Sequence, residues 1–192
     1  MPERSSTPRS PRNPIGRLLA WWRVPTYRFA GSFLLYLGAI ALAFPFLRIR
    51  LAALFYMANV VTAEIVHGLL SLFTSNTRIA GETIVSLAGF SVTIIEECTG
   101  IYEALILAAA LLAYPTAWRH TLVGFALGIP MIYAMNVLRI AMLLVTGGYS
   151  QRWFDFMHLY FWQVTMIAMV ATAWLAWLWW VVRDETDPAA VS

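Results

Sequence analysis

Three residues of types that carry out acyl transfer stand at or near the ends of apolar runs. Cys98 precedes TGIYEALILAAALLAY, Arg139 lies within NVLRIAMLLV, and His158 falls in DFMHLYFWQ. A thiol at a helix N-terminus lies near the positive end of the helix dipole, which favours the nucleophilic thiolate. An arginine deep in an apolar stretch is costly unless it meets a partner, water or a substrate. The pattern suits attack of the thiolate on a peptide carbonyl, with His158 moving protons and Arg139 stabilising the oxyanion.

Each of these residues also has a plain structural interpretation. A lone cysteine in an apolar chain is often a small filler, an arginine near the end of a span often extends its charge to the interface, and a single interfacial histidine is often structural. Their order favours the chemical interpretation. Cys98 opens the third apolar run, Arg139 nears the end of the fourth and His158 opens the fifth, so we expect all three on one membrane face.

The composition is that of an integral membrane protein. Of the 192 residues, 60% are hydrophobic and 12% charged, and the mean hydropathy is +0.69. Soluble domains carry about a quarter charged residues, so a water-soluble enzyme and a disulfide scaffold are both excluded. At about 20 apolar residues per crossing, the chain supplies four or five spans. All 13 basic residues are arginine, and six precede the first span, which favours an anionic membrane surface over nucleic acid as the partner.

The predicted fold class is therefore all-α, a bundle of four or five transmembrane helices with a short β-hairpin before Cys98. We expect helices near 29–47, 51–73, 99–113, 117–145 and 159–182, a hairpin within 82–94, and a polar connector at 149–155 after Gly147-Gly148. We divide the chain into an Arg-rich cytoplasmic tail and lead-in (1–28, with 1–14 disordered), a catalytic transmembrane domain (29–183) and an acidic tail (184–192). A small or polar stripe, Asn59, Ala63, His67 and Ser71, lets helix 51–73 either cross the bilayer or lie along its surface.

Acidic residues and one asparagine near these three residues are candidates for supporting roles. Glu96, Glu97 and Asp155 are candidates to orient His158 or to receive a basic group, although acidic residues at a water boundary are usually just solvated. Asn136 shares a helix face with Arg139 and is a candidate to hydrogen-bond the scissile region or a neighbouring helix. Glu64 and His67 are too few for a metal site. We predict no metal and no cofactor.

The segments ECTGIYEALILAAALLAYP and NVLRIAMLL, with a histidine soon after the next turn, resemble the exosortase and archaeosortase family of membrane transpeptidases. The resemblance covers about residues 51–182 and is closest to the compact exosortase H type. It implies that Cys98, Arg139 and His158 are the catalytic residues. One departure is Thr99, where serine is more frequent in the family.

The resemblance further implies a multi-pass protein of the bacterial inner membrane that cleaves exported proteins near a C-terminal sorting tail. That tail consists of a short motif, a transmembrane helix and an Arg-rich end, and the acyl group passes to an acceptor. This role requires the site to face the periplasm, so we expect helix 51–73 not to cross fully. Two alternatives stay open: a non-enzymatic scaffold or chaperone for sorted proteins, and a Cys-dependent acyl or lipid transferase.

Overall fold

The computed structural model describes residues 24–186, most of which are helical. The helices are α2 (Pro25–Arg50), α3 (Ala52–Ser71), α4 (Ile101–Ala113), α5 (Trp118–Tyr149), α6 (Gln151–Phe156) and α7 (Trp162–Thr186). Three strands, β1 (Thr77–Ala80), β2 (Ile84–Leu87) and β3 (Phe90–Thr93), precede a 3-10 turn, η1 (Glu96–Cys98), and a π-helical turn, η2 (Met157–Phe161), joins α6 to α7. Among these described residues, four helical segments are long and apolar enough to cross a membrane: α2, α3, α5 and the continuous run 151–186. The predicted all-α membrane class with a short β element is confirmed.

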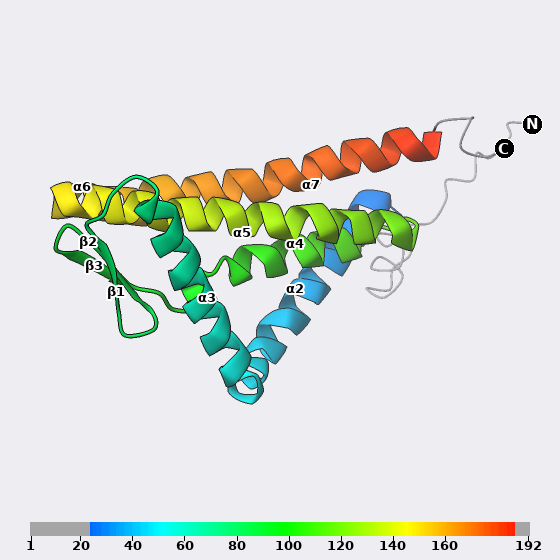
Figure 1. The fold of residues 1–192 in the computed structure, drawn as a ribbon. Helices are drawn as coiled ribbons and strands as arrows, with labels where there is room; N and C mark the ends of the chain where they lie inside the picture. Colours follow the sequence, from blue (N-terminus) through cyan, green and yellow to red (C-terminus); the bar gives the residue numbers. More distant parts are fainter. Residues whose placement is uncertain (1–23, 187–192) are drawn as a thin grey trace, which may run out of the picture.

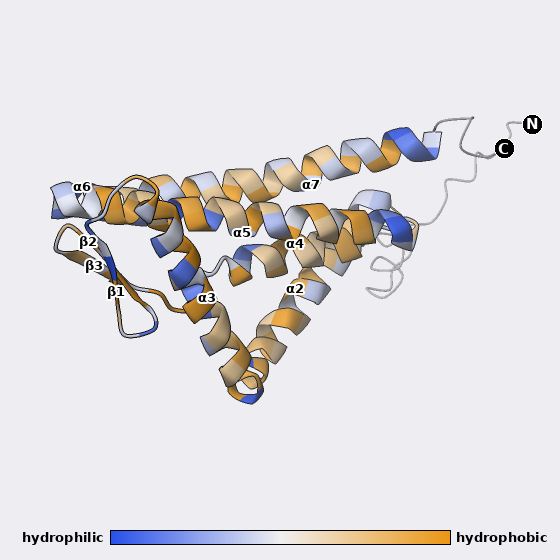
Figure 2. Cartoon of the chain, in the orientation of Figure 1, coloured by the Kyte–Doolittle hydropathy of each residue, from blue (hydrophilic) through white to orange (hydrophobic). Residues whose placement is uncertain are grey.

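Helices α5 and α7 form a long antiparallel pair (Figure 1). One end of the pair, which we call the sheet end, holds α6, η2 and the strands; the other, the terminal end, holds Pro25, Trp118 and Thr186. Figure 2 shows hydrophilic residues towards both ends of the pair and mostly hydrophobic residues between them. This distribution suits a pair that crosses a bilayer with its ends at the two surfaces.

Helix α4 is shorter than a crossing. Its 13 residues extend about 20 Å, against about 30 Å for the hydrocarbon core. It packs on α5 at Gly124 and Gly128, where an added Cβ would overlap Leu107, Leu111 or Trp177. Close packing at small residues is how helices associate in membranes, and it places the start of α4 part-way along α5.

Helices α2 and α3 form a V that is broken at Leu51 (Figure 1). The buried side chains of α3 are Asn59, Thr62, Ala63, Val66 and Leu70. The predicted stripe is thus only half right, because His67 is merely half-buried and Ser71 is exposed. A strict spacing of four residues drifts around a helix of about 3.6 residues per turn, so the inward face follows mixed steps of three and four.

The strands form an antiparallel sheet in the order β1-β2-β3. The expected hairpin is β2–β3, in which Leu87 pairs with Phe90 across a two-residue turn. Ala88 and Gly89 have φ of +50° and +91°, the left-handed geometry that such turns require. Strand β1 is a finding that the sequence pattern did not predict.

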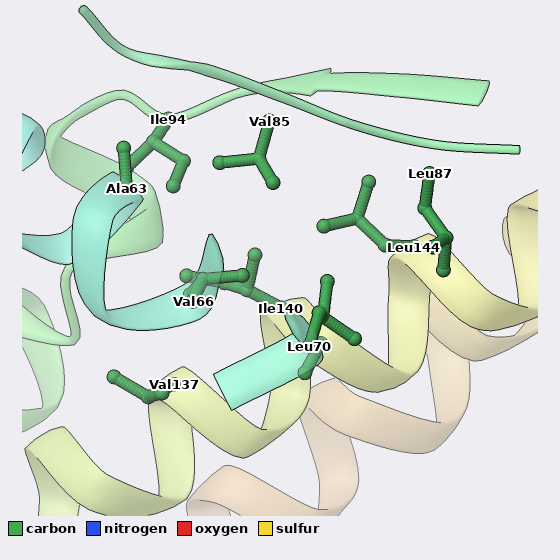
Figure 3. Close-up of a cluster of buried hydrophobic side chains, with 10 residues drawn as sticks. Ala63, Val66, Leu70, Val85, Leu87, Ile94, Val137, Ile140 and Leu144 are labelled. Carbon is green, nitrogen blue, oxygen red and sulfur yellow. The ribbon is translucent and has the colours of Figure 1, made fainter. Parts of the chain in front are cut away.

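A cluster of buried side chains joins the sheet to α3 and α5 (Figure 3). Val85, Leu87 and Ile94 from the sheet segment meet Val66 and Leu70 of α3. Residues of α5 complete the cluster: Val137, Ile140, Ala141 and Leu144. The sheet is therefore held at the sheet end of α5, next to the segment that carries Cys98.

Two boundary predictions are wrong. Helix α5 runs through Gly147 and Gly148 to Tyr149, and the expected polar connector at 149–155 is mostly the helix α6. Gly147 lies under the ring of Phe90 with no room for a Cβ, so this glycine serves packing and does not end the helix. The predicted tail at 1–14, lead-in residues 15–23 and residues 187–192 of the acidic tail lie outside the described residues.

Candidate functional site

Cys98 is the last residue of the turn η1, between the sheet and α4. Its N–H donates to the carbonyl of Ile95 at 2.8 Å, and the Thr99 hydroxyl donates to the carbonyl of Glu96 at 2.7 Å. The side chain is half-buried and packs against the cluster of Figure 3. The thiol is thus held on a short hydrogen-bonded turn and not, as predicted, at the first residue of the helix.

Gly100 allows the chain to pass from this turn into α4. Its φ is +75°, a value that favours glycine. A Cβ at this position would lie 3.3 Å from both Asn136 Cβ and Ile132 Cγ2. The start of α4 therefore packs closely against α5 at Asn136, which we expected to have a supporting role.

Asn136 connects Cys98 to α5. Its side chain is fully buried, and its Nδ2 donates a hydrogen bond to the Cys98 carbonyl oxygen. Its Oδ1 is buried and has no hydrogen-bond partner among residues 24–186. The interaction fixes the main chain of Cys98 against the helix that carries Arg139 three residues later.

Arg139 is half-buried on α5. It lies 21 residues after Trp118, which corresponds to about 32 Å along the helix, and hence near the sheet end. Within residues 24–186 its guanidinium makes no ion pair and no hydrogen bond. A half-buried cation without a partner among these residues is available to a substrate or to developing negative charge.

His158 lies on the π-helical turn η2. Its ring stacks on Phe154, with centroids 5.5 Å apart and an interplanar angle of 7°. Its Nδ1 is buried and has no hydrogen-bond partner in the part of the chain that the structure describes. The charges of Arg139 and Asp155 both act on the imidazole. Isolated π-helical turns are frequent at functional sites, and no feature of the sequence predicted this one.

The structure places the three predicted residues on segments that meet at the sheet end, namely η1, α5 and η2. No hydrogen bond or ion pair joins Cys98, Arg139 and His158 to one another in the described part of the chain. Catalytic hydrogen bonds are often long without substrate and shorten in the complex. Within the described residues, the arrangement offers a half-buried thiol, an arginine without an ion-pair partner and an imidazole whose ring nitrogens make no hydrogen bond.

The predicted acidic helpers have other neighbours. The Asp155 carboxylate accepts a hydrogen bond from Gln151 Nε2 at 2.9 Å, so its effect on His158 is through charge alone. Glu96 and Glu97 lie near the Tyr102 hydroxyl. None of the three hydrogen-bonds His158 in the described residues.

Two apolar pockets lie between the helices and away from these residues. One, of about 470 Å³, is lined by α4, α5 and α7 around Gly124 and Gly128. The other, of about 310 Å³, is bounded by α2, α4 and α7 and includes Glu103, Phe33 and Ile167. Neither is lined by Cys98, Arg139 or His158.

Comparison with protein families gives one finding. Residues 16–177, most of the chain, match the family of transmembrane exosortases. Comparisons with curated proteins and with solved structures gave no match.

Proposed function

We propose, because this chain belongs to the transmembrane exosortase family, that it is a membrane-embedded cysteine transpeptidase which cleaves the C-terminal sorting signals of exported proteins. The family acts on exported proteins that carry such signals and has a general role in sorting at the membrane. The observation that best supports the proposal is the hydrogen bond from Asn136 to Cys98, because it joins the thiol's turn to the helix bearing Arg139.

The mechanism assigns one role to each residue. The Cys98 thiolate attacks the carbonyl carbon of the scissile peptide, and Arg139 stabilises the negative oxygen of the tetrahedral intermediate. The C–N bond then breaks while His158 protonates the leaving amine, leaving a thioester on Cys98. An acceptor nucleophile gives its proton to His158 and attacks the thioester, which releases the thiolate.

The substrate and location complete the proposal. The substrate is an exported protein whose C-terminus carries a short motif, a transmembrane helix and an Arg-rich end. The enzyme lies in the bacterial inner membrane with the sheet end facing the periplasm. The catalytic domain spans 29–183, flanked by the tails 1–28 and 184–192.

The decisive experiment is cleavage in cells. A tagged exported protein with such a C-terminal tail is co-expressed with the wild type or with Cys98→Ala, Arg139→Ala or His158→Ala at matched membrane levels. Wild type should cleave the tag, and all three variants should lose cleavage. Arg119→Ala, an arginine exposed at the terminal end, is the matched control and should cleave normally. Equal processing by Cys98→Ala would overturn the proposal in favour of a scaffold.

A further inference from the structure

The outer edge of strand β3 leaves backbone groups unpaired. Ile94 N–H donates to the Thr83 carbonyl at 2.8 Å, so the backbone of residue 94 points towards β2. Because successive residues of a strand alternate, Ser91 and Thr93 direct their N–H and C=O groups away from β2. Within residues 24–186 no hydrogen bond occupies these groups.

The other edge of the sheet is protected. Ala88 N–H donates to the Asn76 carbonyl, so the backbone of residue 76 points towards β2. By the same alternation, the backbone N–H and C=O groups of Thr77 and Ile79 on β1 point away from β2. Strand β1 lies against α3 and β3 lies against α5, but Thr77 is only 7% exposed, whereas Ser91 and Thr93 are exposed. Strand β1 also carries the charged Arg78, but β3, with the sequence FSVT, has neither charge nor proline. Proteins normally blunt an exposed edge with such residues.

The open edge of β3 lies near both Cys98 and His158. In the chain, only residues 94–97 separate Thr93 from Cys98. In space, the ring of Phe90 lies 5.0 Å from that of Phe154, which stacks on His158. An extended chain placed along β3 would therefore run beside the two residues that carry out bond cleavage in the proposed mechanism.

We propose that the outer edge of β3 binds an extended stretch of the substrate polypeptide by strand addition, next to the scissile bond. This inference rests on the proposed function and names how that site holds its substrate. Main-chain pairing supplies affinity and register, while side chains at alternate positions supply selectivity. A four-residue strand matches a short recognition stretch, and pairing satisfies peptide groups that would otherwise lie unpaired near the bilayer.

Disulfide cross-linking tests the register directly. In Cys98→Ala, which removes the chain's only cysteine, Ser91→Cys is combined with a substrate whose single cysteine is moved one residue at a time through the segment before its membrane helix. With copper phenanthroline as oxidant, we expect cross-links at alternate substrate positions. Thr93→Cys should move that pattern by two residues. Arg78→Cys, on β1, is the matched control and should give no pattern.

The remaining outcomes overturn the proposal. Cross-links without alternation mean that the substrate is near the edge but not paired with it. Ser91→Cys linking two copies of this chain, with no link to substrate, would assign the edge to a dimer.

Cleavage measurements separate this proposal from the proposed function. Thr93→Pro removes an outward N–H without touching the β2 ladder and should reduce cleavage by about tenfold, through KM more than kcat. Ile79→Pro makes the same change on the protected edge and should leave cleavage unaltered. Normal cleavage by Thr93→Pro would contradict strand addition, while absence of Cys98-dependent cleavage by the wild type would contradict the proposed function itself.

Discussion

Asn136 shows how one buried amide can set the position of a nucleophile. It donates to the carbonyl of Cys98, not to the thiol, and is fully buried. A lost hydrogen bond here leaves a backbone acceptor unsatisfied in a dry environment. Asn136 is therefore a positioning residue that acts through the main chain of Cys98.

Replacing Asn136 by alanine should slow cleavage more than it destabilises the fold. We expect Asn136→Ala to lower kcat by about tenfold or more, because the Cys98 carbonyl on the turn η1 loses the hydrogen bond that fixes its position. Cleavage at matched membrane levels measures the effect, with thermal unfolding in detergent as the stability readout. Asn59→Ala is the matched control, since Asn59 is buried but does not hydrogen-bond Cys98. Equal kcat loss in both variants would contradict the positioning role.

Gly100 permits a second prediction at the scale of one residue. Gly100→Ala meets both the strain of φ +75° and contacts at 3.3 Å with Asn136 and Ile132. Gly89→Ala has a similar φ, +91°, but open space around it. Strain alone costs about 1–3 kcal/mol, so Gly100→Ala should be the more destabilised of the two and should also lose cleavage. Equal unfolding temperatures would show that α4 shifts to make room.

At the scale of elements, the sequence predicted best where physical constraints are local. Long apolar runs predicted the helices, and Ala88-Gly89 predicted the hairpin turn. Strand β1 was missed because its sequence, TRIA, does not alternate between apolar and polar residues as FSVT of β3 does. The π-helical turn η2 was missed because the packing around His158 and not the local sequence determines it.

For the candidate site, too, the sequence predicted local features but not long-range contacts. The residue types at Cys98, Arg139 and His158 drew attention to them, but the hydrogen bond of Asn136 joins residues far apart in the chain. Gly147 was taken as a helix stop, although its small size serves the contact with Phe90. Residue type therefore suggests candidates, while their spacing in three dimensions follows from tertiary contacts.

Another long-range set of contacts ties α5 to α7 at the terminal end. His120 is 2% exposed, its Nε2 lies 2.9 Å from Asp184 and its Nδ1 lies 2.9 Å from the Thr116 hydroxyl. The Thr116 proton is donated to Glu185, so Thr116 accepts from Nδ1. The buried His120 ring therefore links the start of α5 to the last turn of α7.

His120→Leu should lower stability without abolishing cleavage. The change removes the hydrogen bonds of a buried ring, at a cost of about 1–3 kcal/mol, but it lies at the opposite end from Cys98 (Figure 1). Thermal unfolding in detergent measures the loss. The control is Arg119→Leu, whose exposed pair with Asp184 spans 3.6 Å and should matter by less than about 1 kcal/mol. Loss of cleavage in His120→Leu at temperatures where it is folded would contradict this separation.

For the whole molecule, the arginines suggest which end faces the cytoplasm. Among the described residues, Arg28, Arg119 and Arg183 lie at the terminal end, where α2 and α5 begin and α7 ends. Arg78 and Arg152 lie at the sheet end. Positive residues favour the cytoplasmic side. Helix α3 runs steeply across α5 (Figure 1), which supports the prediction that it does not cross fully.

Cysteine labelling in intact bacterial cells tests this orientation. In Cys98→Ala, we expect Arg78→Cys to react with a membrane-impermeant maleimide and Thr186→Cys to react only after lysis, because the two positions lie at opposite ends of the α5–α7 pair. Labelling of Thr186→Cys alone would put Cys98 in the cytoplasm, where exported proteins are no longer present after transport. The cysteine chemistry would then require a different substrate, even if the fold and the hydrogen bond from Asn136 were unchanged.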